Sequence, residues 1–244
     1  MKNLIIAILF IPAFVYGQYP DGKELLEKID ENMSSDSRIF TSTMVIHGRR
    51  GSRNIESKSW SEGEENSFTE YLAPSREMGT KMLKLEDLLW MYSPSTDRII
   101  KISGHMLRQS VMGSDLSYED MLDDKKMTES YDAVVNAEED FNGTPCWVID
   151  LKAKTDDLAY DSRKIWVDKD RFIPIKQELF AKSGKLLKRM EMSDVIRVQD
   201  RWYPRKMTFK DMLKEGKGTE FIVTEIQFDV PIPPDILTKG SLKK

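Results

Sequence analysis

The feature that most constrains the fold is a succession of short strand-like segments separated by turn signals. In the second half of the chain, alternating, β-branched and aromatic residues fill the segments 146–153, 163–167, 173–181, 185–195, 202–209 and 219–228. Turn signals built from Gly, Asn, Asp and Ser lie at 61–63, 142–143, 168–170, 183–184, 199–200 and 215–218. Helices do not alternate regularly with these strands, so the pattern predicts an antiparallel meander and disfavours a parallel α/β fold.

Alternation within the strands predicts a sheet with one apolar and one solvated face. Trp147, Ile149 and Leu151 fall on one side of their strand, whereas Asp150 and Lys152 fall on the other. An apolar sheet face must be covered by other elements of the fold.

Two helices are predicted to supply part of this cover. Asp21 and Glu24 have capping-box spacing, and four apolar residues then follow on one helix face: Leu25, Leu26, Ile29 and Met33. Ser117 and Asp120 have the same spacing and predict a short helix over 117–124, inserted between two halves of the sheet. We expect a mainly β (α+β) fold, a single large curved antiparallel sheet of roughly eleven strands with two or three helices covering its concave face.

The first seventeen residues have the pattern of a signal peptide. Lys2 precedes an apolar run over 4–15, which is shorter than the roughly 20 residues that a transmembrane helix needs. Val15 and Gly17 provide small residues at positions −3 and −1 of a cut before Gln18. We expect residues 1–17 to be cleaved after export and residues 18–244 to form a single domain. An uncleaved N-terminal anchor is the alternative.

The composition disfavours several classes of function. The chain has two histidines, His47 and His105, and one cysteine, Cys146, which argues against zinc sites and histidine-based catalysis. A formal net charge of −4 argues against a nucleic-acid partner. We expect no metal and no cofactor. Cys146 is expected to be a buried apolar residue without an intramolecular disulfide.

A cluster of polar residues lies at the start of the predicted central helix. We expect these residues, Ser114, Asp115, Ser117 and Asp120, to cap and charge the helix N-terminus in a lid. A docking or lid-hinge role is one alternative, and a carboxylate pair for acid–base catalysis with Glu119 is another. The sequence contains no Gly-x-Ser-x-Gly elbow and no phosphate-binding loop, so we do not expect an enzyme.

Methionine is unusually frequent, with 14 residues against 13 Gly. Seven lie around the central insertion: Met78, Met82, Met91, Met106, Met112, Met121 and Met127. Methionine adapts to varied apolar shapes, so this cluster beneath a small helical lid favours an apolar ligand cavity. Ordinary core filling is the alternative.

The strand pattern gives a set of candidate cavity residues. They are Met44, Ile46, Leu83, Leu85, Trp90, Met91, Ile100, Ile102, Met112, Met121, Trp147, Ile149, Ile165 and Val167. Both faces of residues 88–92 are apolar, so the sequence leaves open which of them point inward.

Two further motifs each have a structural and a functional interpretation. Arg49, Arg50 and Arg53 form a basic turn, either solvated or in contact with lipid headgroups or an acidic partner. Asn142-Gly143-Thr144 matches a glycosylation triplet but is predicted to be a tight turn.

Three stretches resemble the LolA-like superfamily of outer-membrane lipoprotein-sorting proteins, in its divergent branch. They are Tyr-Ser-Pro at 92–94 leading into Asp-Arg-Ile-Ile-Lys-Ile at 97–102, the segment 108–121 with Gly-Ser-Asp-Leu-Ser-Tyr-Glu-Asp at its centre, and the tail over 230–242. The resemblance covers nearly the whole chain after Gly17.

This resemblance implies an unclosed β-barrel with helices over its concave side and a cavity for acyl chains. It also implies a monomeric periplasmic carrier or chaperone that moves a lipid or lipoprotein toward the outer membrane. An inner-membrane transporter would be the donor, and an outer-membrane protein the acceptor. The polar residues that regulate the lid of the well-described LolA carrier have no match here, so none is transferred.

Three other functions are alternatives to a carrier: a scaffold, an outer-membrane β-barrel and a hydrolase. A non-catalytic scaffold docked to an inner-membrane transporter complex would have a cavity filled with side chains. An outer-membrane β-barrel is disfavoured because the strands carry too much charge for a lipid-facing band. A hydrolase is disfavoured because no set of nucleophile and base is recognisable.

Overall fold

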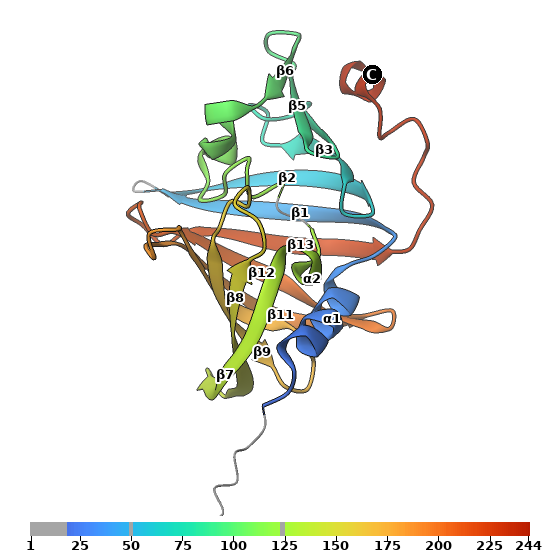
Figure 1. Ribbon diagram of the computed structural model, residues 1–244. Coiled ribbons are helices and arrows are strands. Elements are labelled where there is room, and N and C mark those ends of the chain that lie inside the picture. Colours follow the sequence, from blue (N-terminus) through green and yellow to red (C-terminus); the bar gives the residue numbers. More distant parts are fainter. Residues whose placement is uncertain (1–18, 49–50, 123–124) are drawn as a thin grey trace, which may run out of the picture.

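The computed structural model describes residues 19–48, 51–122 and 125–244, and within them it contains one antiparallel sheet of 13 strands (Figure 1). The first six strands form one meander: β1 (Ser37–Gly48), β2 (Gly51–Glu62), β3 (Asn66–Ala73), β4 (Lys81–Leu85), β5 (Leu88–Ser93) and β6 (Arg98–Ile102). The other seven form a second: β7 (Tyr131–Phe141), β8 (Thr144–Ala153), β9 (Ser162–Asp168), β10 (Pro174–Phe180), β11 (Leu186–Val198), β12 (Arg201–Asp211) and β13 (Thr219–Phe228).

The two meanders join where β1 pairs with β13, so the first and last strands of the chain lie side by side in the middle of the sheet. β6 and β7 are the two outer strands, and residues 103–130 connect them. This connection contains two 3₁₀ turns, η1 (Gly104–Arg108) and η2 (Val111–Gly113), and the single-turn helix α2 (Met127–Ser130). The sheet is curved but not closed, which confirms the expected unclosed barrel.

Helix α1 (Gly22–Met33) covers the part of the sheet formed by β7, β8 and β9. Asp21 caps it as predicted, because its Oδ1 accepts hydrogen bonds from the amides of Lys23 at 2.9 Å and Glu24 at 3.1 Å. Leu25, Leu26 and Ile29 are buried in one core cluster. Burial of side chains of this size contributes about 1.5–3 kcal/mol each.

The segment after β13 covers the opposite face of the sheet. It ends in the 3₁₀ turn η3 (Lys239–Lys243), where Leu242 is fully buried against Phe68, Leu83 and Trp90. The ammonium of Lys81 donates to the carbonyl oxygen of Lys244 at 2.7 Å. The other face of β3, β4 and β5 packs against the central insertion, so both faces of these strands are covered.

The central insertion differs from the prediction. Residues 118–122 form turns, so the helix expected over 117–124 is wrong for this described part. The predicted capping contact nevertheless forms, because Asp120 Oδ2 accepts from the amide of Ser117 at 2.6 Å and from its hydroxyl at 2.8 Å. Asp120 also contacts Lys188 of β11 and Tyr160 of the connection between β8 and β9, as described below.

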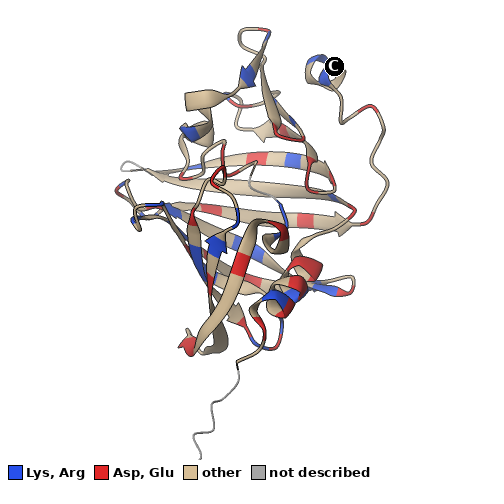
Figure 2. Ribbon diagram, viewed as in Figure 1, with Lys and Arg blue, Asp and Glu red and all other residues tan. Residues whose placement is uncertain are grey.

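Several local predictions are confirmed, and others fall outside the described residues. Asn142 and Gly143 have φ angles of 53° and 84° in the tight turn between β7 and β8. Cys146 is fully buried with a free thiol. The proposed signal peptide, Arg49 and Arg50 lie outside the described part of the chain. Figure 2 shows both signs of charge spread along the sheet and its loops.

Candidate functional site

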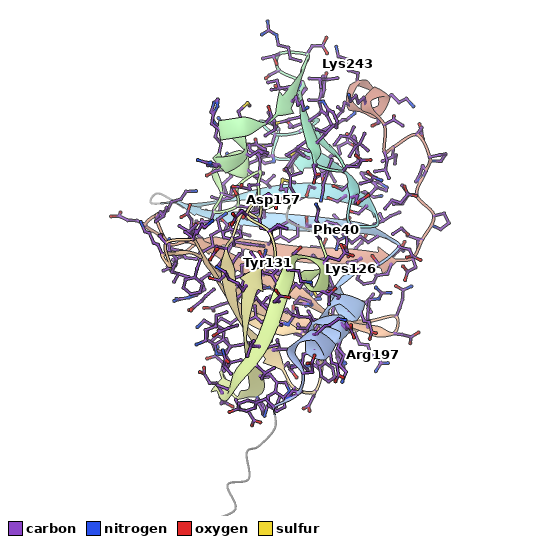
Figure 3. All side chains as sticks on the ribbon, in the orientation of Figure 1. Phe40, Lys126, Tyr131, Asp157, Arg197 and Lys243 are labelled. Carbon is purple, nitrogen blue, oxygen red and sulfur yellow. The ribbon has the colours of Figure 1, made fainter. Side chains whose placement is uncertain are left out.

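A largely apolar cavity of about 320 Å³ lies inside the curve of the sheet. Its apolar and aromatic lining comprises Met33, Phe40, Leu116, Met121, Met127, Tyr160, Leu179, Met190, Met192, Tyr203, Met207, Phe209 and Phe221. Most of these residues come from β1 and from strands β10 to β13, and Phe40 on β1 is labelled in Figure 3. The volume is at the lower end of the range for small-molecule pockets.

A smaller chamber of about 110 Å³ adjoins the first under the central insertion. The two share Phe40, Leu116, Met121 and Phe221, and the second adds Tyr71 on β3. Burial raises the pKa of Tyr71 far above its usual value, so this phenol is neutral. Its hydroxyl donates to the sulfur of Met82 at 3.4 Å, and the chamber is almost entirely apolar.

Residues 104–122, which we call the lid, pack an apolar underside onto the first meander. Val111 and Tyr118 are buried in a cluster with Met44, Ile55 and Tyr71 of the sheet. Partly buried lid residues extend this cluster: Met106, Leu107, Met112, Leu116, Met121 and Leu122. The lid thus covers one part of the concave side by apolar packing on strands β1 to β6.

Polar contacts fasten the other edge of the lid to the second meander. The carboxylate of Asp115 accepts from the amide of Asp211 and the hydroxyl of Thr219, both at 3.0 Å. The amide of Asp115 donates to Thr219 Oγ1 at 3.0 Å. Within the lid, the hydroxyl of Ser114 accepts from the amide of Leu116 at 3.1 Å. Asp115 therefore joins the lid to β12 and β13 instead of capping a helix.

Asp120 forms a further, largely buried lid contact. Its carboxylate forms an ion pair with Lys188 of β11, and their side chains are only 13% and 11% exposed. The hydroxyl of Tyr160 donates to Asp120 Oδ1 at 2.5 Å, and Ser117 supplies the two donors described above. We call Ser117, Asp120, Tyr160 and Lys188 the latch, because they join the lid to the barrel wall at the cavity.

A polar neck lies where the main cavity meets a recess of about 130 Å³ beside α1. Arg38, Arg163 and Gln177 line both spaces. The guanidinium of Arg163 lies 4.7 Å from the ring centre of Tyr131, a cation–π contact. Gln177 is only 3% exposed, and its Oε1 accepts no hydrogen bond within the described part of the chain. Such a buried acceptor favours a hydrogen-bond donor from bound ligand or water.

The structure distributes the fourteen candidate residues over five environments. Two of them, Met44 and Met121, line the cavity or its smaller chamber. Four pack in or against the cluster under the lid: Ile46, Met91, Ile102 and Met112. Ile100 on the outer strand β6 is 37% exposed. A role of these side chains in binding remains a prediction.

Leu83, Leu85 and Trp90 occupy a different place from the one predicted. They belong to the cluster under the C-terminal segment, on the face opposite the cavity. Along β5, Leu89 and Met91 point toward the lid cluster and Trp90 points away, which settles the open question of residues 88–92. The prediction failed because covered apolar residues line both faces of these strands.

Trp147, Ile149, Ile165 and Val167 point to the concave side as predicted, but α1 fills the space in front of them. They pack in or against the core cluster that includes Leu25, Leu26 and Ile29. None of the four lines the cavity. The concave side is therefore divided into a part filled by α1, an open middle and a part filled by the lid.

Sequence reasoning missed the main wall of the cavity, on β10 to β13 and β1. Met190 and Met192 alternate along β11, and Met207 and Phe209 alternate along β12, so the period-two signal was present. Of the seven methionines around the central insertion, only Met121 and Met127 line this cavity.

Two further properties concern the described residues. No group of three or more His, Cys, Asp and Glu side chains comes together there in an arrangement that could hold a metal ion. No helix in this part of the chain combines the length and apolar character needed to span a membrane.

Comparison with known proteins places the chain in a family. A family model described as "Uncharacterized protein" matches residues 63–244. The chain belongs to this family. No curated protein matches the chain.

Solved structures share its fold. A domain described as an outer membrane lipoprotein-sorting protein from Vibrio parahaemolyticus is 23% identical, with a TM-score of 0.80 over 91% of this chain and 98% of that one. A DUF1329 family protein from Desulfovibrio piger is 24% identical, with a TM-score of 0.81 over 91% and 97%. A LolA superfamily protein from Nitrosomonas europaea is 23% identical, with a TM-score of 0.76 over 91% and 100%. The resemblance to LolA-like proteins is thus confirmed in the fold.

Proposed function

We propose that this protein is a periplasmic carrier that binds the acyl chains of a lipid or lipoprotein in its cavity and moves this cargo toward the outer membrane. The observation that carries the proposal is the largely apolar cavity of about 320 Å³ between the sheet and a fastened lid. The fold shared with a lipoprotein-sorting domain supports the same function.

The lining suits a flexible apolar ligand. Six of the cavity residues are methionines, Met33, Met121, Met127, Met190, Met192 and Met207, whose unbranched side chains adjust to different shapes. Burial of acyl chain contributes about 0.8 kcal/mol per methylene, so ten methylenes give about 8 kcal/mol before ordering costs. A binding free energy of this size keeps an acyl chain out of water and still allows its release.

The polar neck gives such a ligand an orientation. Acyl chains would fill the apolar middle, while the ester, amide or headgroup of the cargo would lie near Arg38, Arg163 and Gln177. The unused acceptor of Gln177 would then receive a donor from the ligand or from water.

The carboxylates of the lid support a carrier over an enzyme. Asp115 and Asp120, the candidates for acid–base work, bind donors from the barrel wall. They fasten the lid in this arrangement: Asp120 lines the cavity, but its carboxylate is occupied by Ser117, Tyr160 and Lys188. We therefore propose that the protein does not catalyse a reaction.

Two measurements test the carrier function. Protein purified from its native periplasm is expected to release a lipid or lipopeptide, detected by mass spectrometry after denaturation. The purified protein is also expected to take up a fluorescent fatty acid. Recovery of no lipid together with no uptake would reject the proposal and favour a scaffold docked to a membrane transporter.

A matched pair of variants tests whether the ligand binds in the cavity. Met190→Trp enlarges a side chain that lines the cavity, so fatty-acid affinity is expected to fall about tenfold or more. Glu191→Trp, one residue further along β11, adds the same ring to an exposed position and is expected to leave affinity unchanged. Equal affinity of the two variants would place the bound chain elsewhere.

The proposed route of the cargo assumes that the protein is exported to the periplasm. An inner-membrane transporter would supply the lipid or lipoprotein, and an outer-membrane acceptor would receive it. The signal-peptide pattern of residues 1–17 is consistent with this location. N-terminal sequencing of the mature protein would test cleavage before Gln18.

A further inference from the structure

The connection between β12 and β13 presents two large apolar side chains to solvent. Leu213 is 61% exposed and Met212 is 37% exposed, and they are adjacent at the end of the barrel. Isolated exposed leucines are common on protein surfaces. Two neighbouring exposed apolar residues at a hairpin tip are unusual when the backbone holds them in place, because they cannot turn inward. We call residues 210–217 the β12–β13 tip.

Hydrogen bonds do fix the tip. The ammonium of Lys210 donates to the carbonyl of Lys214 at 2.5 Å across the turn. The amide of Leu213 donates to Asp211 Oδ1 at 2.9 Å, and the amide of Met212 donates to the carbonyl of Leu187 at 2.8 Å. The backbone is therefore held in a shape that keeps Leu213 outward.

Charge around the two apolar residues is weighted toward the basic side. Lys210, Lys214 and Lys217 flank them, against Asp211 and Glu215. Asp211 is turned into the tip, where it accepts the amide of Leu213 and lies 3.5 Å from the ammonium of Lys214. Apolar side chains between lysines are suited to the boundary between headgroups and acyl chains of an anionic membrane.

The tip is also joined to the lid. The ammonium of Lys214 donates to Ser110 Oγ at 2.7 Å and to the carbonyl of Ser114 at 2.8 Å. The amide of Asp211 donates to Asp115. A change in the surroundings of Lys214 therefore acts directly on two contacts that hold the lid.

A further cavity, separate from the three described above, lies between the tip and the latch. Its volume is about 240 Å³, and Leu213, Lys214 and Leu187 form part of its wall. It shares Leu116, Tyr160 and Lys188 with the apolar cavity, so these residues, two of them in the latch, form the partition between the two spaces. We call this outer space the vestibule.

We propose that the β12–β13 tip inserts Met212 and Leu213 into the surface of a phospholipid membrane with anionic headgroups, so that the vestibule and the latch face the lipid. Three observations support it: the fixed exposure of the two apolar residues, the flanking lysines, and the continuity of the tip with the lid and vestibule. Membrane contact at the tip does not depend on the cavity function, whereas passage of a lipid through the vestibule rests on the proposed function.

Vesicle cosedimentation of the purified protein tests membrane contact. The protein is expected to bind vesicles of phosphatidylethanolamine with phosphatidylglycerol more tightly than vesicles of phosphatidylcholine, and binding should weaken with added salt. The double variant Met212→Ser/Leu213→Ser is expected to bind the anionic vesicles about tenfold or more weakly, a change of about 1.4 kcal/mol per tenfold. The matched control is Val134→Ser on β7, which removes an apolar side chain that is 60% exposed elsewhere.

A second readout reports the position of the tip directly. Tryptophan fluorescence of Leu213→Trp is expected to be quenched by vesicles with brominated acyl chains, whereas that of Val134→Trp is not. Absence of vesicle binding by the unchanged protein, or equal loss in the Val134→Ser control, overturns the membrane proposal. Vesicle binding without fatty-acid uptake would instead contradict the carrier function alone, so the two failures are distinguishable.

Discussion

A Lys188→Met substitution would remove the ion pair between lid and barrel wall while keeping a side chain of similar length. Lys188 and Asp120 are 11% and 13% exposed, so the carboxylate would be left nearly buried without its counter-ion. Removing one partner of a buried ion pair typically costs about 3–5 kcal/mol. Asp120 would keep its donors from Ser117 and Tyr160, so we expect the lower part of that range, about 3 kcal/mol.

This cost applies to the closed position of the lid, because an open lid would return Asp120 to water. Hydrogen exchange followed by mass spectrometry measures the opening locally. Amides of residues 118–122 are expected to lose about 100-fold or more of their protection, the factor that corresponds to about 3 kcal/mol. Amides of α1 serve as an internal control, because α1 packs on β7 to β9 away from the latch.

The double variant Asp120→Asn/Lys188→Met separates charge from shape. With both charges removed, no buried carboxylate lacks a partner, so the lid is expected to regain part of its protection. A coupling energy of about 0.5–3 kcal/mol between the two substitutions is expected. If the two single effects simply add, or if Lys188→Met leaves lid protection unchanged, the latch does not hold the lid and the reasoning is refuted.

Three further predictions concern other parts of the fold. Leu242→Ala, which empties a fully buried site under Phe68, Leu83 and Trp90, is expected to lower the free energy of unfolding by about 2–5 kcal/mol in urea titration; a loss under about 0.5 kcal/mol would mean that the C-terminal segment does not cover that face. Burial raises the pKa of Tyr71, so its contribution to stability is complete below pH of about 10 and is lost as pH rises above that value. Tyr71→Phe should therefore show less alkaline destabilisation than the unchanged protein in denaturant unfolding, and an equal pH dependence of both would contradict the burial of this phenol. Burial, with Asp168 nearby, raises the pKa of Cys146 to about 11, so its reaction with a thiol reagent near neutral pH should be roughly 100-fold slower in the folded than in the unfolded chain; comparable rates in native buffer and denaturant would show an accessible thiol.

The sheet was predictable because its signals are local. The strand over 219–228 has the predicted limits, and β8 to β12 differ from their predicted segments by a few residues at the ends. Each hairpin carries its own turn residues, as in Asn142-Gly143, and each strand its own alternation. The helix expected over 117–124 failed because Asp120 is held by Lys188, 68 residues away, a contact that local spacing does not reveal.

The cavity was less predictable, because alternation identifies the two faces of a strand but not what covers each face. Ile149 and Met190 both point to the concave side, yet α1 fills the space before Ile149 and leaves the space before Met190 open. Leu83 has the same apolar character and lies on the opposite face, because Leu242 covers it there. Which apolar residues line the cavity therefore depends on where α1 and the segment after β13 pack against the sheet.

The pairing of β1 with β13 has a consequence for how the protein acquires its structure. In the middle of the sheet Arg38 of β1 pairs with Phe228 of β13, although the two residues are separated by 190 positions in the chain. On a ribosome or at a translocation channel, the hydrogen-bonding groups of β1 that face β13 must wait until nearly the whole polypeptide has emerged. The other eleven pairings of the sheet join strands that are consecutive in sequence, so this one distant pairing carries the largest loop-closure cost. The two meanders can therefore join into one sheet only after β13, the last strand in sequence, is available.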